Sequence, residues 1–147
     1  MQNSFSRFSI GIYELSRYWH RIAGNEMRRY GLKGSFSVYF TTLYRFPDGI
    51  TAGQLCKLAG RDKADVSRAM TVLQEQGLVE RDANGKTYRA LLKLTAEGRK
   101  LAEQVCKKAD SVMGHVGQGL TDEDRAVFYK VLDRINDNLH QLDIDEL

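Results

Sequence analysis

Proline and cysteine are scarce in this 147-residue sequence, which argues against frequent helix breaks and against a fold held by disulfides. Proline occurs once, at Pro47, so long helices can form without the breaks that proline imposes. The two cysteines, Cys56 and Cys106, match no metal-ligand spacing, and a single pair is a weak indication of a disulfide. We therefore expect a reducing environment and a cytoplasmic location.

Long apolar runs are missing as well. The longest uncharged apolar runs are far too short to cross a bilayer, and residues 1–7 lead into a charged amphipathic segment rather than a signal peptide. The histidines His20, His115 and His140 stand on separate predicted helices, with no cysteine or carboxylate at ligand spacing. We expect no membrane association, no metal and no other cofactor. No motif for a nucleophile with its base, or for a phosphate-binding loop, is found, so we expect no catalytic residues and no enzyme.

Charge is distributed unevenly along the chain. The net charge is only +3, but residues 61–100 carry nine Lys and Arg against six acids, whereas residues 121–147 carry three against eight. A basic middle followed by an acidic C-terminal segment indicates that one part of the molecule meets a polyanion and the other does not.

Apolar spacing predicts mostly helices. Residues 6–30 carry apolar side chains three and four apart, which predicts a long amphipathic helix that ends at the glycines that follow. A second helix is predicted over residues 35–46. A third begins at Thr51, which opens a capping-box pattern, and is expected to turn Leu55 and Leu58 inward.

The fourth predicted helix covers residues 63–76, with Asp62 as its cap. At about 100° per residue, Val66, Met70 and Leu73 fall on one face. The N-terminal half of the opposite face is small and basic, so it can approach the floor of a DNA major groove, where an arginine pairs well with guanine. The contacts with DNA expected from this helix are Lys63, Ala64, Ser67, Arg68 and Thr71.

The apolar period changes after the fourth helix. Residues 78–81 and 87–94 resemble strands and flank a segment with Asn84-Gly85, which is a strong hairpin signal. A fifth helix is predicted after Thr95 and a sixth after Thr121. The sixth carries a broad apolar stripe formed by Val127, Phe128, Val131, Leu132, Ile135, Leu139 and Leu142.

Two short helices joined by a glycine-bearing turn and followed by a hairpin are the order of a winged helix-turn-helix. The predicted fold class is therefore mainly α with a small β-hairpin wing, flanked by N- and C-terminal helices. In such a fold the second helix of the pair enters the major groove, which here is the helix over residues 63–76.

The segments 60–68, 73–81 and 94–98 resemble the MarR family of bacterial transcriptional regulators. They read GRDKADVSR, LQEQGLVER and LTAEG, close to the family's recognition helix, the strand after it and the start of the next helix. Many members carry Asp-x-Arg at the wing, with the arginine in the minor groove. Here the corresponding stretch is slightly shorter, and either Lys86 or Arg89 takes that role.

The resemblance implies a homodimer that binds double-stranded DNA at a pseudo-palindromic operator. Residues 35–100 would form the DNA-binding domain, and residues 1–34 and 101–147 the helical dimerisation region. We expect a repressor that a small aromatic anion releases from DNA. The further DNA contacts implied around the wing are Arg81, Lys86 and Arg89.

The resemblance also implies an effector pocket among the first, second and fifth helices. Arg17 is four residues after Tyr13, so a cation would lie beside an aromatic wall, which suits a carboxylate or phenolate on a ring. Pairing of Arg17 with Glu14, or with an acid of a partner subunit, is the alternative. The predicted ligand-binding residues are Tyr13, Arg17, His20, Tyr39 and Leu43.

Three further alternatives stay open. The winged-helix lobe could bind a partner protein as an adaptor, although the basic face of the fourth helix favours DNA. Asp65 is interpreted as a partner in the helix cap rather than as a base contact. The aromatic residues Tyr13, Trp19, Tyr39 and Tyr44 are expected to belong to the core rather than to a ligand cage.

Overall fold

The fold is described by a computed structural model that covers residues 2–82 and 90–142, with side chains from residue 6 onward. The chain divides into two units, residues 1–110 and residues 111–147. The helices are α1 (Gln2–Arg29), the short 3-10 helix η1 (Gly34–Phe36), α2 (Ser37–Tyr44), α3 (Ala52–Ala59), α4 (Lys63–Glu75), α5 (Ala96–Val116) and α6 (Asp122–Gln141).

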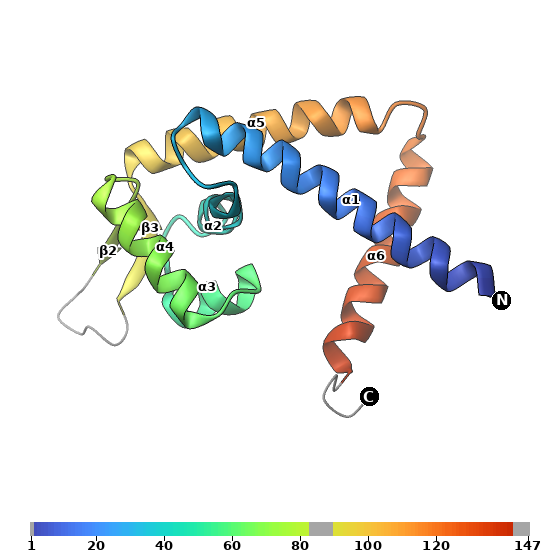
Figure 1. The fold of residues 1–147 in the computed structure, drawn as a ribbon, viewed down its shortest axis with the longest axis horizontal. Coiled ribbons are helices and arrows are strands. Elements are labelled where there is room, and N and C mark those ends of the chain that lie inside the picture. Colours follow the sequence, from blue (N-terminus) through green and yellow to red (C-terminus); the bar gives the residue numbers. More distant parts are fainter. Residues whose placement is uncertain (1, 83–89, 143–147) are drawn as a thin grey trace. The chain divides into compact units, whose positions relative to one another are not determined.

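The unit that contains α2, α3 and α4 also contains a small antiparallel sheet (Figure 1). It contains β1 (Ile50–Thr51), β2 (Val79–Asp82) and β3 (Leu91–Leu94) in the order β1-β3-β2. Ile50 pairs with Leu92, and Val79 pairs with Leu94. The predicted fold class is confirmed, and the sheet gains one strand that the sequence analysis missed. That strand is only two residues long, too short for an alternating pattern to mark it.

The predicted caps of α3 and α4 are confirmed, whereas α1 begins at Gln2, four residues before its predicted start. The Thr51 hydroxyl accepts a hydrogen bond from the Gln54 backbone N–H at 3.2 Å, and the Gln54 side chain accepts one from the Thr51 backbone N–H at 2.9 Å. Asp62 Oδ1 accepts from the Asp65 backbone N–H at 2.8 Å. Each cap satisfies a backbone donor that has no partner within the helix. Between α3 and α4, Gly60 has a φ of 62°, the left-handed conformation that lets the chain turn sharply.

The core of the first unit lies where α2, α3, α4 and β3 meet. Its fully buried side chains come from all four elements and from the end of α1, and the largest are Tyr39, Phe40, Met27, Leu43, Leu55, Met70, Leu73 and Leu92. Burying each such apolar side chain stabilises the fold by about 1.5–3 kcal/mol. This core fixes the orientation of α4. The predicted inward position of Leu58 is wrong, because α3 leaves that side chain 52% exposed.

Only the C-terminal end of α1 packs into this core. There Gly24 lies against Gly34 of η1 so closely that a Cβ on Gly34 would come within 2.7 Å of the Gly24 Cα. The earlier turns expose their apolar side chains, including Ile12 and Leu15 at 47% and 57%. The apolar stripe predicted for this helix therefore exists, but most of it is uncovered within the chain.

The second unit holds the end of α5 and the whole of α6. Thr121 caps α6 through a capping box with Asp124, and this hydrogen bonding by the Thr121 backbone N–H and hydroxyl lowers the pKa of the Asp124 carboxyl. The Arg125 guanidinium donates to the Gly117 carbonyl at 2.9 Å, which joins the turn to the first residues of α6. No residue of α6 in the described part of the chain is buried.

Candidate nucleic-acid interface

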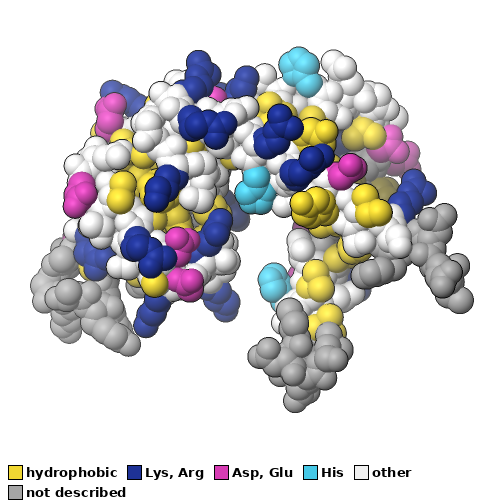
Figure 2. Space-filling model, viewed as in Figure 1, with side chains coloured by type: hydrophobic (Ala, Val, Ile, Leu, Met, Phe, Trp, Pro, Cys, Tyr) yellow, Lys and Arg dark blue, Asp and Glu magenta, His cyan; other side chains and the backbone are white. Residues whose placement is uncertain are grey.

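Helix α4 separates its side chains into a buried and an exposed face. Val66, Ala69, Met70 and Leu73 are at most 2% exposed. The exposed side chains include all those expected to face DNA, namely Lys63, Ala64, Ser67, Arg68 and Thr71, and also Glu75 at the C-terminal end of the helix. The predicted orientation of the helix is confirmed, while the DNA contacts themselves stay predictions. Figure 2 shows Lys and Arg side chains over α3 and α4, with carboxylates among them.

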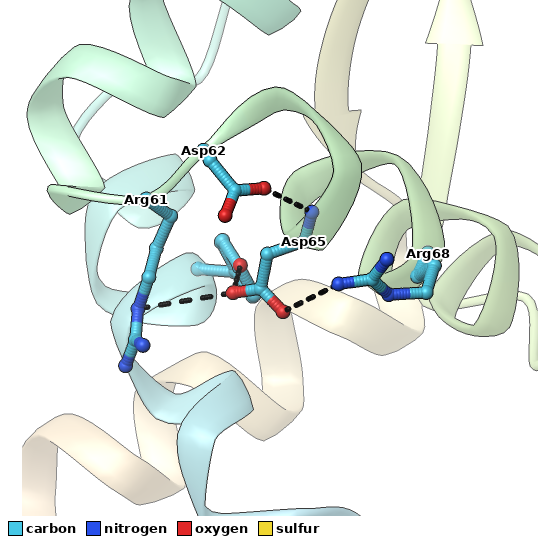
Figure 3. Close-up of polar contacts among 5 residues, drawn as sticks. Arg61, Asp62, Asp65 and Arg68 are labelled. Atoms are coloured by element: carbon cyan, nitrogen blue, oxygen red, sulfur yellow. Dashed lines mark hydrogen bonds and ion pairs between the residues drawn. The ribbon is translucent and has the colours of Figure 1, made fainter.

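The carboxylate of Asp65 lies between two arginines at the start of this face (Figure 3). Arg61 Nε is 3.9 Å from Asp65 Oδ2, and a terminal nitrogen of Arg68 is 3.9 Å from Asp65 Oδ1. The Tyr39 hydroxyl donates a hydrogen bond to Asp65 Oδ2 at 2.8 Å. Asp65 joins the helix cap through its backbone N–H alone, and its side chain is engaged elsewhere, contrary to the interpretation as a cap partner.

Arg81 of β2 lies beside the exposed face of α4. Together with Lys63, Ala64 and Ser67 it lines a shallow hollow, whose floor includes Val66 and Met70 and whose far side is formed by α3. On the neighbouring strand, Lys93 Nζ lies 3.5 Å from Glu80 and 3.7 Å from Asp82. The structure thus brings Arg81 to the helix residues predicted with it. Lys86 and Arg89, the two candidates for a minor-groove contact, lie outside the described residues.

The predicted ligand-binding residues do not form one site. Tyr39 and Leu43 are 1% and 0% exposed, within the core. Burial, reinforced by the hydrogen bond to Asp65, raises the pKa of the Tyr39 hydroxyl to about 12. Tyr13, Arg17 and His20 lie on α1 along an open hollow, which they share with Ser16, Arg21, Asn25 and Arg28. The alternative expectation, that the aromatic residues belong to the core, is therefore confirmed for Tyr39 and is wrong for Tyr13 and Trp19, which are 70% and 42% exposed.

The cation and aromatic pair expected on α1 is also different. The Arg17 guanidinium lies 5.0 Å from the centre of the Tyr18 ring, and that of Arg21 lies 5.9 Å from the same ring. Tyr13 is 70% exposed. The aromatic partner of Arg17 is therefore Tyr18, the next residue in sequence, and not the predicted Tyr13.

A second pocket, of about 230 Å³, lies between α1, α2 and α5, where the sequence analysis expected one. Its lining is mostly apolar, with Glu26 and Lys108 as charged groups; of the predicted residues it contains His20 alone. Glu26 is 7% exposed, and its carboxylate is 3.3 Å from Arg29. The apolar residues of this pocket carry no motif, and the signal that could have found them is their helical spacing. They are Trp19, Ile22, Ala23, Val38, Val105 and Ala109.

Residues 2–82 and 90–142 hold no group of three potential metal ligands, and none of their helices is long and apolar enough to cross a membrane. Burial, aided by nearby Asp110, raises the pKa of the Cys106 thiol, which disfavours its reactive thiolate form.

The comparisons agree with this architecture. The sequence profile of the MarR family matches residues 30–90. An HTH-type transcriptional regulator of Bacillus subtilis, YdgJ, is 28% identical over 114 residues, which are 77% of this chain and 69% of that protein. The solved structure of the transcriptional regulator PA3341 has a TM-score of 0.81 at 26% identity, over 92% of this chain and 99% of that one.

A further solved structure is that of a MarR family regulator from Listeria monocytogenes, complexed with a 26mer DNA. It has a TM-score of 0.79 at 20% identity and covers 89% of this chain and 86% of that one. Helices α3 and α4 with the sheet that follows them make the protein a winged helix-turn-helix protein. Over residues 30–90 the sequence resembles the MarR family, and the fold resembles that of solved members of this family. The matching family and these relatives are transcriptional regulators, not enzymes.

Proposed function

We propose that this regulator binds double-stranded DNA in a sequence-specific way, with α4 in the major groove. The observation that carries the proposal is the N-terminal half of the exposed face of α4, which is small and basic and lies opposite a fully buried apolar face. Ala64 and Ser67 allow close approach to the groove floor, and Arg68, 72% exposed at its side chain, can reach guanine N7 and O6. The Listeria relative that shares this fold was solved with DNA.

The remaining contacts would come from the hollow beside α4 and from the wing. Lys63 and Arg81 line the same hollow, so both can reach one phosphate backbone. Lys86 and Arg89 are the wing candidates for a minor-groove contact. Contacts to phosphates fix the position of the protein on the duplex, and those of Ser67, Arg68 and Thr71 would supply sequence discrimination.

The protein would act as a homodimer on a pseudo-palindromic operator. The exposed apolar side chains of α6 and of the first turns of α1 support this, because water contact with so much apolar surface is unfavourable. Residues 1–34 and 101–147 would form the dimerisation region and residues 35–100 the DNA-binding domain. Two copies of α4 would then enter successive major grooves, about 34–36 Å apart.

We further propose that the dimer represses transcription and that a small aromatic anion releases it. A ligand that binds more tightly to a dimer whose two α4 helices are wrongly spaced would shift the population away from DNA. The hollow with Tyr13, Arg17 and His20 and the apolar pocket between α1, α2 and α5 are the two candidate binding sites. Titration of salicylate against the DNA complex, with wild type and Arg17→Ala, tests the first site. Release of DNA from both proteins alike would exclude Arg17.

DNA binding is tested most directly at Arg68. Fluorescence anisotropy with duplexes from the DNA flanking the protein's own gene would yield the operator and its affinity. Arg68→Ala should cost about 1–3 kcal/mol of specific binding per half-site while the protein stays folded. Arg45→Ala, which removes an exposed arginine that follows α2 and is not among the predicted DNA contacts, is the matched control and should bind normally.

The salt dependence of the same titrations separates DNA binding from an adaptor function. Phosphate contacts release counterions, so the affinity for DNA should fall steeply as salt rises. Wild-type operator affinity in Arg68→Ala at matched salt would contradict the placement of α4 in the groove.

A further inference from the structure

The carboxylate of Asp65 is the least expected feature of the proposed DNA-binding face. A carboxylate repels phosphates, and this one has a side chain 39% exposed on the third residue of α4, in the turn that would enter the groove. Its three partners belong to different segments of the chain: Tyr39 lies on α2, Arg61 in the turn before α4, and Arg68 one turn further along α4.

Stability alone does not account for this arrangement. The Arg61 and Arg68 side chains are 37% and 72% exposed, and both approach Asp65 only to 3.9 Å. Exposed ion pairs of this kind contribute about 0–1 kcal/mol each. The hydrogen bond from Tyr39 is shorter, at 2.8 Å, and comes from a side chain fixed in the core. The carboxylate is thus held firmly from the core side, while it holds the two arginines loosely from the DNA side (Figure 3).

We propose that Asp65 is a positioning residue for DNA specificity: fixed by Tyr39, it directs Arg68 and Arg61 and suppresses their binding to non-specific phosphates. This rests on the proposed DNA-binding function. An arginine with no such neighbour pairs with any phosphate within reach, because its long side chain is flexible. Next to Asp65, the Arg68 guanidinium is held along the helix, and phosphates that approach meet a negative charge. Guanine, which offers neutral acceptors, meets less repulsion.

The proposal predicts that neutralising Asp65 strengthens the wrong kind of binding. Asp65→Asn should raise the affinity for a duplex of unrelated sequence about threefold to tenfold and lower the ratio of operator to non-specific affinity by at least as much. The slope of log affinity against log salt on unrelated DNA should steepen by about 1–2, as Arg61 and Arg68 become available to phosphates. A merely structural role would weaken binding to both duplexes and leave this slope unchanged.

Two further variants separate the charge from its placement. Glu75→Gln removes one negative charge from the other end of α4 and should leave the affinity ratio unchanged, which controls for net charge. Tyr39→Phe keeps the buried ring and the Asp65 charge but removes the hydroxyl that fixes it. It should weaken operator binding without strengthening non-specific binding. Urea unfolding of each variant would verify that it is folded.

The outcomes of these experiments separate the positioning role of Asp65 from the proposed DNA binding on which it depends. If wild type prefers its operator and Asp65→Asn keeps both the affinity ratio and the salt slope, the positioning role is wrong and DNA binding stands. If Glu75→Gln matches Asp65→Asn, the effect is one of net charge and the role is also wrong. If wild type binds no duplex, both proposals fall.

Discussion

Helices α4 and α6 have similar N-terminal caps and apolar stripes, but their apolar stripes lie in different environments. Each starts at a side-chain cap, Asp62 or Thr121, and each carries apolar residues at helical spacing. In α4 the apolar face is covered by the chain itself, and Leu73 is 0% exposed. In α6 the corresponding stripe is open, and Val131 and Leu139 are each 50% exposed.

The comparison of α4 with α6 shows how much an apolar stripe predicts about a helix. The stripe indicates that some surface must cover the helix, because exposed apolar area is unfavourable in water. It does not indicate whether that surface belongs to the same chain. For α4 the cover is the core of α2, α3 and β3, and for α6 we propose that it is a second copy of the chain.

The largest effect is expected from a charge placed in the stripe of α6. Val131→Asp would bury a carboxylate in the proposed dimer interface, so sedimentation should show a monomer at micromolar concentration. Operator affinity should fall at least about 100-fold, because the second half-site no longer contributes. Asn136→Asp adds the same charge about 140° further around the helix and should leave the dimer intact. A folded wild-type monomer at micromolar concentration would contradict the proposed cover.

The next largest effect concerns the covered helix. Leu73→Ala should lower the free energy of unfolding by about 2–5 kcal/mol, because it leaves a cavity among packed side chains. Leu139→Ala on α6 should instead raise the dissociation constant of the dimer. Urea unfolding and sedimentation on both variants would test the contrast. If Leu73→Ala changed the dissociation constant of the dimer and Leu139→Ala did not, the predicted contrast between the two helices would be wrong.

The two helix caps should respond to mutation in different measurements. Asp62→Ala and Thr121→Ala each remove a side chain that satisfies a backbone N–H, at a cost of about 1 kcal/mol. Because α4 is packed in the core, the first change should lower the global free energy of unfolding. The second should show mainly as faster hydrogen exchange in the first turn of α6, and equal exchange in wild type and Thr121→Ala would refute this.

The effect with the least influence near neutral pH concerns Tyr39, whose hydroxyl donates a hydrogen bond from α2 to Asp65 of α4, and it appears only at alkaline pH. Its pKa is raised from 10.0 to about 12 in the folded protein, chiefly by burial. The stabilisation is therefore complete below about pH 10 and is lost as the pH rises towards 12, since the unfolded state ionises first. In urea unfolding between pH 9 and 12, the free energy of unfolding should fall less for Tyr39→Phe than for wild type. Tyr129→Phe, which changes an exposed tyrosine of α6, should show the same fall as wild type.

Local features of the sequence were sufficient to predict much of α4 and its surroundings. The Asp62 cap, the buried face with Val66 and Leu73, and the exposed face with Ser67 and Arg68 were all predicted before the structure. Caps and periodicity operate within one or two helical turns, so they can be read without knowing which elements meet. The family resemblance rests on the same segment and the strands after it.

Tertiary structure decided which side chains meet across the fold. Tyr39 and Asp65 are 26 residues apart, and no local pattern joins them. Tyr39 was therefore predicted to lie either in a ligand pocket or in the core, Asp65 was predicted to join a helix cap, and no contact between them was predicted. The two-residue strand β1 forms only because β3 lies beside it. The periodicity of a helix fixes the face on which a side chain lies, but its partner depends on the packing of the other elements against that face.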